Sequence, residues 1–292
     1  MNKDKPQSIR FHEDSDLFVE SLNFTATETA FLPRLIEKDY FCSVLLEYLM
    51  TDDTLVFKGG TCLTKAYLGF YRLSEDLDFV IPTPIDATRT QRSHLAAGIK
   101  RAFNAITDVL PVFRIAQPMT GSNNSTQYIG IVTYTSPYSG QQDTIKIEVG
   151  LREPLLLPKT AAACATILLD PVSRQPMVQA VKAGCIDRQE AYAEKYRAAL
   201  SRREAAIRDF FDIDYAIQNN DLNPEDKNLI LMVREKLAIP GNEPANISNE
   251  RKQSLQRQLD TQLKPVLRNK DFRNFDLERA FHAAERMVER LN

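Results

Sequence analysis

Two glycines, a threonine and two aspartates between residues 57 and 79 (FKGGTCLTKAYLGFYRLSEDLDF) have the residue types for binding phosphate and a divalent cation. Gly59 and Gly60 allow the backbone to approach a ligand closely. The hydroxyl of Thr61, with the N–H groups of the helix expected to begin there, favours an anion. Asp76 and Asp78 are two residues apart on an expected strand, so both carboxylates point to one face. Mg²⁺ prefers such oxygen ligands and leaves positions for phosphate oxygens, so this order predicts phosphoryl or nucleotidyl transfer.

Either part of this pattern has a common structural explanation when it occurs alone. A Gly-Gly pair before a helix is usually a turn, and an Asp-x-Asp pair is usually part of a surface strand. Their occurrence together, in the order strand, glycines, helix, loop and Asp-x-Asp strand, favours a functional site.

Helices and short strands must position these residues in the first half of the chain. Apolar residues at helical or alternating spacing predict the following elements: helices over 34–50, 61–70 and 86–109, and strands over 54–58, 76–81, 112–116, 127–135 and 143–149. The segment SPYSGQQ at 136–142 is the expected hairpin turn between the last two strands.

The second half of the chain has a helical character. Residues 155–183 are mixed, with three prolines that break any long helix, and helices are expected over 187–206, 206–219, 224–238, 247–268 and 275–291. We therefore predict an α+β fold, with a mixed-sheet core over 1–154 and an all-helical domain over 155–292 that completes the active site.

The composition excludes several classes of protein. No run of about 18 apolar residues predicts a transmembrane helix, and the polar first residues do not resemble a secretory signal. The four cysteines are far apart in the sequence, which favours buried, reduced thiols and a cytoplasmic location. The net charge of −2 gives no support to a protein that binds nucleic acid non-specifically over a wide surface. Residues 195–208 nevertheless carry five bases and one acid and could contact phosphates locally.

The motifs K-G-G-T-x-L-x-K-x-Y and R-x-S-E-D-L-D-F resemble those of the AbiEii-type nucleotidyltransferase toxins. These MenT-like enzymes of type IV toxin–antitoxin and abortive-infection systems belong to the nucleotidyltransferase-β superfamily. Three further stretches are similar to the family: I-E-K-D-Y at 36–40, K-I-E-V at 146–149, and the paired-helix motif within 193–213. The resemblance extends over residues 34–216.

The resemblance implies a role for each matching residue of the glycine and carboxylate motifs. Gly59, Gly60 and Thr61 would hold the nucleoside triphosphate, and Asp76 and Asp78 would be the catalytic ligands of Mg²⁺.

Four residues beyond those motifs also match. Lys146 would touch phosphate or pair with Glu148, which would be the superfamily's third carboxylate or a structural strand residue. Lys195 would neutralise triphosphate charge, and Asp209 would complete the site from the helical part.

Several assignments stay open on the sequence alone. Asp212 could be catalytic or could brace helices, Arg72 could reach a phosphate or Glu75, and the roles of Lys58 and Lys65 are ambiguous. The sequence departs from the family pattern at Phe211, which replaces the family's usual tyrosine and so lacks its hydroxyl.

The resemblance makes the chain an expected Mg²⁺-dependent toxin that transfers NMP from NTP to the 3′ end of tRNA and blocks translation and growth. Its expected partners are NTP, tRNA and an antitoxin that is a DNA-binding regulator. No association with a membrane is expected. The alternatives are transfer to a protein or a small molecule, and an inactive member that binds NTP or antitoxin without turnover.

Overall fold

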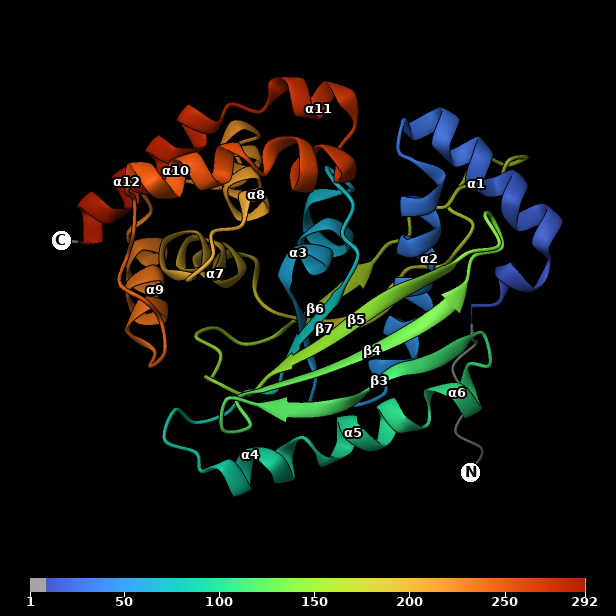
Figure 1. Cartoon of the computed structure of the whole chain (residues 1–292), viewed down its shortest axis with the longest axis horizontal. Coiled ribbons are helices and arrows are strands. Elements are labelled where there is room, and N and C mark those ends of the chain that lie inside the picture. Colours follow the sequence, from blue (N-terminus) through green and yellow to red (C-terminus); the bar gives the residue numbers. More distant parts are fainter. Residues whose placement is uncertain (1–8, 292) are drawn as a thin grey trace. The chain divides into compact units, whose positions relative to one another are not determined.

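The computed structural model describes residues 9–291, which divide into two compact units. The first unit extends to Leu155 and also includes Lys159–Ile186, and the second comprises Leu156–Pro158 and the chain from Asp187 onward. Figure 1 shows the course of the chain and the element labels.

The first unit is built on a mixed sheet of seven strands in the order β3-β4-β5-β2-β1-β7-β6. Its strands are β1 (Val56–Lys58), β2 (Leu77–Val80), β3 (Phe113–Ser122), β4 (Gln127–Thr135), β5 (Gln142–Gly150), β6 (Thr160–Cys164) and β7 (Val181–Cys185). The β2–β5 and β1–β7 pairs are parallel, and the other neighbours are antiparallel. This sheet confirms the predicted α+β fold class.

The first unit also contains helices among its described residues. They are η1 (Phe11–Glu13), α1 (Ser15–Thr29), α2 (Pro33–Leu49), α3 (Gly59–Cys62), the π-helical η2 (Leu63–Leu68), α4 (Arg89–Leu95), α5 (Ala97–Asn104) and α6 (Ile106–Val109). The ring of Phe41 of α2 packs at a tilt against that of Tyr134 of β4, with ring centroids 4.2 Å apart. Phe103 of α5 packs against the same strand at Gly130, where a Cβ would lie 2.5 Å from the ring.

The second unit contains only helical elements among its described residues, as predicted. They are α7 (Arg188–Ser201), α8 (Ile207–Gln218), α9 (Lys227–Ala238), α10 (Asn249–Gln256), η3 (Leu259–Leu263), η4 (Lys264–Val266), α11 (Asn269–Asn274) and α12 (Leu277–Leu291). Asp187 caps α7 by accepting from the N–H of Gln189. The buried carboxylate of Glu190 lies 2.7 Å from the ammonium of Lys236 and accepts two backbone N–H bonds.

The structure differs from the sequence prediction in three segments. Residues 159–186, which were expected to belong to the helical part, supply β6 and β7 to the sheet, because β7 pairs in parallel with β1. The single helix expected over 86–109 is three short helices, α4 to α6. The helix expected over 247–268 ends at Gln256 and continues as π- and 3₁₀-helical turns, with Pro265 in the latter.

The structure also bears on the expectations for the cysteines and for membrane-spanning helices. The four cysteines are free and buried, as expected. No helix within residues 9–291 is both long and apolar enough to cross a membrane.

Candidate active site

The two aspartates of the Asp-x-Asp motif lie at the start of β2, beside a carboxylate on the neighbouring strand. Asp76 immediately precedes the strand and Asp78 is its second residue. Register places Asp78 opposite Glu148 of β5 on one side and opposite Lys58 of β1 on the other. Register partners project to the same face of a sheet, so the sheet fold brings Asp78, Glu148 and Lys58 together.

A lysine and a glutamine surround the carboxylate of Glu148. The ammonium of Lys146 lies 3.2 Å from Glu148 Oε2 and 3.8 Å from Asp76 Oδ2. The side-chain amide of Gln127 on β4 donates to Glu148 Oε1 at 2.7 Å. Burial acts to raise the pKa of Glu148, but the Gln127 hydrogen bond and the Lys146 charge outweigh it and hold the pKa below its ordinary value.

Negative charge accumulates at Asp78. Burial, followed by the neighbouring charge of Glu148, raises the pKa of Asp78 to about 6, against the opposing influence of Lys146. The same carboxylates raise the pKa of Lys146, although its burial opposes the shift. The three carboxylates of Asp76, Asp78 and Glu148 outnumber the two nearby ammonium groups of Lys58 and Lys146, so this group can accept further positive charge.

Neighbouring protein side chains leave no room for a Cβ at either of the two glycines, whether or not a ligand is bound. Gly59 has a φ of +75°, and a Cβ there would lie 2.3 Å from Asp78 Oδ2. A Cβ on Gly60 would lie 2.3 Å from a guanidinium nitrogen of buried Arg72. The glycines were expected to admit a ligand to the backbone, whereas the structure places the carboxylate of Asp78 against the backbone of Gly59.

The hydroxyl of Thr61 has a partner within the protein. The side chain is buried, and its hydroxyl donates to the main-chain carbonyl of Asp76. This bond ties the first turn of α3 to the residue before β2. It fixes the position of the glycine turn relative to Asp76, and it uses the hydroxyl proton that was expected to serve an anion.

The Glu-Lys-Asp segment of α2 positions the glycine helix. The ammonium of Lys65 lies 2.6 Å from Asp39 Oδ1, and both side chains are buried. Lys65 also donates to the hydroxyl of Ser43 at 2.8 Å and to the carbonyl of Ala165 at 3.3 Å. Lys65, which was ambiguous in the sequence, therefore joins α2 to η2 in the core.

The same segment also holds the loop that leads into β2. The ammonium of Lys38 lies 3.5 Å from Glu75 Oε1 and 3.2 Å from Asp143 Oδ1. Arg34 contacts the same two carboxylates. Since Glu75 immediately precedes Asp76, this network fixes the start of the Asp-x-Asp strand.

Lys195 and Asp209 come together within the helical unit. The Lys195 ammonium lies 2.9 Å from Asp209 Oδ1 and 2.7 Å from Asp212 Oδ2, and the guanidinium of Arg202 lies 3.2 Å from Asp209 Oδ2. Burial acts to raise the pKa of Asp209, but the charges of Lys195 and Arg202 hold it below its ordinary value. Asp212 is fully buried and pairs with Lys195, which gives it a bracing role between α7 and α8.

The basic stretch 195–208 is used largely inside the helical unit. Lys195 and Arg202 form the ion pairs described above. Arg197 donates to Asn242, and Arg208 donates to the main-chain carbonyl of Gln262. The exposed phosphate-binding face expected from this stretch is therefore reduced, because most of its cations have partners in the same unit.

Two contributors to the carboxylate group were missed in the sequence. Gln127 orients Glu148, and Lys38 holds Glu75 next to Asp76. Hairpin register could have identified Gln127, because Ile129 lies opposite Glu148 and Gln127 is two residues earlier on the same face. Lys38 had no such local signal, since it acts through a contact between residues far apart in the chain.

Few side chains among the described residues are placed to ligate a metal ion. Among residues 9–291, no group of three or more His, Cys, Asp or Glu side chains is placed to hold a metal ion. Two aspartates would therefore have to be supplemented by oxygens of a bound nucleotide and by water, which is how Mg²⁺ is usually held.

A family comparison decides the class of protein. Residues 49–286 match the family described as nucleotidyl transferase AbiEii toxin, type IV toxin–antitoxin system. The chain belongs to the AbiEii family. It is therefore a nucleotidyltransferase toxin, with an NTP as substrate and an antitoxin as partner. The resemblance found in the sequence is confirmed.

Solved structures with a similar course of the chain include two proteins from Helicobacter pylori. One is assigned as a nucleotidyltransferase, with 17% identity, a TM-score of 0.45, and coverage of 93% of this chain and 96% of that chain. The second is JHP933, with 17% identity, a TM-score of 0.44 and coverage of 93% of each chain.

MenT4, a nucleotidyltransferase toxin from Mycobacterium tuberculosis, is also similar. Its identity is 17% and its TM-score is 0.37, with coverage of 87% of this chain and 94% of that chain. None of the curated proteins compared with the chain matches it.

Proposed function

We propose that this AbiEii toxin transfers NMP from an NTP to the 3′ end of tRNA in a Mg²⁺-dependent reaction in the cytoplasm. The resulting block of translation would arrest growth, and the antitoxin would be a DNA-binding regulator. The single observation that supports the reaction best is the grouping of three carboxylates beside the Gly59 turn: Asp76 just before β2, Asp78 on β2 and Glu148 on the adjacent strand β5.

The residues present fit a divalent cation. The raised pKa of Asp78, caused by burial and by the Glu148 charge, reflects an excess of carboxylate in one place. Asp76 and Asp78 would hold Mg²⁺, with triphosphate oxygens and water as further ligands. When bound, Mg²⁺ would neutralise charge on the triphosphate and polarise the α-phosphate.

The chain's own groups have distinct tasks in the proposed reaction. The acceptor hydroxyl oxygen forms a bond to the α-phosphorus, the bond from that phosphorus to the bridging oxygen breaks, and pyrophosphate leaves. Backbone around Gly59 and Gly60 holds the triphosphate. Glu148, which Gln127 and Lys146 keep ionised, takes the hydroxyl proton.

Lys195 and Asp209 remain proposed contributors from the helical part. Lys195 would neutralise triphosphate charge, a role that suits a compact, strongly hydrated cation. Its present partners are Asp209 and Asp212, so the proposal requires Lys195 to exchange or share one of these carboxylates with phosphate.

A matrix of nucleotides and acceptors tests the proposal. Each of the four α-labelled NTPs is incubated with the protein and total RNA, purified tRNA, or a protein extract, with Mg²⁺ or with EDTA. We expect one dominant NTP, label on tRNA, and no label in EDTA. Oxidising the terminal diol of tRNA with periodate should abolish labelling, because the proposed acceptor hydroxyl is destroyed. Label on a polypeptide or small molecule, with tRNA unlabelled, would identify the alternative acceptor class.

A further inference from the structure

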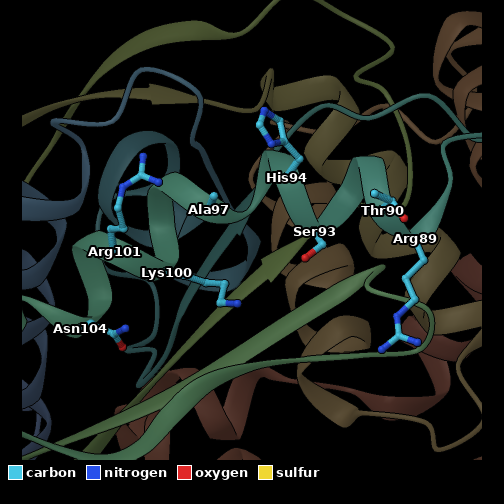
Figure 2. A pocket seen from close by; sticks show the side chains of 8 residues that line it. All are labelled: Arg89, Thr90, Ser93, His94, Ala97, Lys100, Arg101 and Asn104. Atoms are coloured by element: carbon cyan, nitrogen blue, oxygen red, sulfur yellow. The ribbon is translucent and has the colours of Figure 1, made fainter.

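A shallow hollow of about 810 Å³ lies on the outer side of α4 and α5, in the first unit. Three cations line it, Arg89, Lys100 and Arg101, together with the polar side chains of Thr90, Ser93 and Asn104. In Figure 2, Ser93 lies between the side chains of Arg89 and Lys100. None of the proposed catalytic residues lines this hollow.

The packing of the two helices fixes which side chains face outward. Arg92 is buried and donates to the main-chain carbonyls of Leu151 and Ile85, which anchors α4 to the unit. Ile99 and Phe103 of α5 are buried, and Phe103 packs against Gly130 of β4. Because these residues occupy the inner side at helical spacing, residues 89, 93, 97, 100 and 104 form a stripe on the outer side.

The Arg and Lys side chains that line the hollow have no partners in the described part of the chain. No side-chain hydrogen bond or ion pair links Arg89, Lys100 or Arg101 to any of residues 9–291. Residues 88–107 contain four Lys or Arg and no Asp or Glu, although the whole chain has a net charge of −2. This arrangement contrasts with the stretch 195–208, where Lys195 and Arg202 are neutralised by buried aspartates.

We propose that the outer side of α4 and α5 binds the phosphate backbone of the RNA acceptor, away from the end that is modified. This inference rests on the proposed function for the identity of the acceptor. Arg and Lys together with Ser, Thr and Asn are the side chains that usually contact nucleic-acid phosphates. Residues 89–101 extend over about 18 Å at the helical rise, enough to meet phosphates of successive nucleotides. No Phe, Tyr, Trp, Leu or Met is among the described residues that line the hollow, whereas the core of a protein interface is enriched in aromatic residues, so the lining favours RNA.

Equilibrium binding of tRNA tests this surface without requiring chemistry. The variant Arg89→Ala/Lys100→Ala/Arg101→Ala is compared with Lys182→Ala/Arg203→Ala/Lys227→Ala, which removes three exposed cations elsewhere in the chain. Binding of unfractionated, fluorescently labelled tRNA is measured by anisotropy at several salt concentrations. Both variants are first checked for an unchanged thermal unfolding midpoint and unchanged NTP binding.

We expect the α4–α5 variant to bind tRNA about 10- to 100-fold more weakly and to lower the slope of log K against log salt by about 2 to 3. The control variant should change the slope by less than about 1. Equal tRNA binding by the two variants would overturn the proposal. It would also be overturned if the α4–α5 variant still bound tRNA as wild type does and lost binding only to an acidic protein or to vesicles with anionic lipid.

The result is distinguishable from failure of the proposed function. Suppose that tRNA binding depends on α4–α5 but that periodate-oxidised tRNA is labelled to the same extent as intact tRNA. The surface is then supported and 3′-end transfer is rejected. If tRNA is labelled at its 3′ end but both triple variants bind it equally, the enzyme assignment stands and the surface is rejected.

Discussion

The ammonium of Lys65 lies 2.6 Å from a carboxylate oxygen of Asp39, and both side chains are almost inaccessible to solvent. This pair joins the Glu-Lys-Asp segment of α2 to the helix that follows the two glycines. Two motifs that are separated in the sequence therefore form one structural unit, which sets the position of the glycine turn beside Asp78.

Breaking the Lys65–Asp39 pair from one side should destabilise the protein strongly. Lys65→Met leaves Asp39 buried without its cation, and we expect a loss of about 3–5 kcal/mol in the free energy of unfolding. Denaturant titration followed by circular dichroism measures the loss. Asp39→Asn/Lys65→Met should cost less than the sum of the two single changes.

An exposed ion pair in the same unit provides the control. Arg10 and Glu13 are paired, but their side chains are 61% and 59% exposed. Arg10→Met should leave the unfolding midpoint unchanged. A similar loss for Arg10→Met and Lys65→Met would show that burial of the pair is not what matters.

Gly59→Ala should damage catalysis more than stability. The new Cβ would lie 2.3 Å from Asp78 Oδ2, so the carboxylate must move. Gly140→Ala is a matched control, because Gly140 has a φ of +72° but a Cβ there would meet no atom within 4 Å. Both changes carry a backbone cost of about 1 kcal/mol. Only Gly59→Ala should lower the rate of NMP transfer by at least about tenfold, and equal rates for the two variants would contradict the assignment of the turn to the site.

Lys195→Met should weaken the helical unit. Asp209 and Asp212 are almost completely buried, and Lys195 is the cation they share. We expect a loss of about 3 kcal/mol in unfolding free energy and a rise in the pKa of Asp209, because its largest stabilising charge is removed. Arg203→Met, at an exposed position nearby in the sequence, is the control and should have no effect on the midpoint. The role of Lys195 toward triphosphate is tested separately, by the KM for NTP of Lys195→Arg.

The stability of the first unit should depend on the pH through Glu37. Burial raises the pKa of Glu37, although its carboxylate accepts a hydrogen bond from the N–H of Tyr138. A carboxyl whose folded-state pKa is raised binds a proton more tightly in the folded than in the unfolded state, so stability falls as the pH rises through that interval.

The variant Glu37→Gln removes this titration. We therefore expect a higher unfolding midpoint than wild type at about pH 7.5, with the difference shrinking as the pH is lowered toward the ordinary pKa of glutamate. Thermal unfolding at a series of pH values measures this difference. A difference that stays constant over the series would show that Glu37 does not titrate differently on folding.

The motifs near the glycines and aspartates were predictable because they depend on short spacing. A strand, a glycine turn and an Asp-x-Asp strand are all local patterns, and hairpin periodicity predicted the bounds of β4. The strands β6 and β7 were missed, because their alanine- and glycine-containing sequences have little β-propensity and pairing with β1 determines them.

Side-chain roles were less predictable than elements. The close approach at Gly59 was expected, but its partner is Asp78, which only the strand pairing reveals. Lys65 and Asp39 are 26 residues apart, so their pairing has no local signal. The charge run at 195–208 was visible in the sequence, but the buried aspartates that neutralise it are identifiable only from the packing of α7 and α8.

The most direct test of the central claim compares Asp78→Asn with Asp53→Asn in the NMP-transfer assay. Asp53 is an exposed carboxylate of the same unit, outside the carboxylate group. Purified proteins of matched thermal midpoint are incubated with labelled NTP, Mg²⁺ and tRNA, and label on tRNA is quantified over time. We expect Asp53→Asn to match wild type and Asp78→Asn to lose at least about 100-fold in rate, a loss of the size seen when one catalytic group is removed. Equal labelling by the two variants would contradict the claim that Asp78 belongs to the active site.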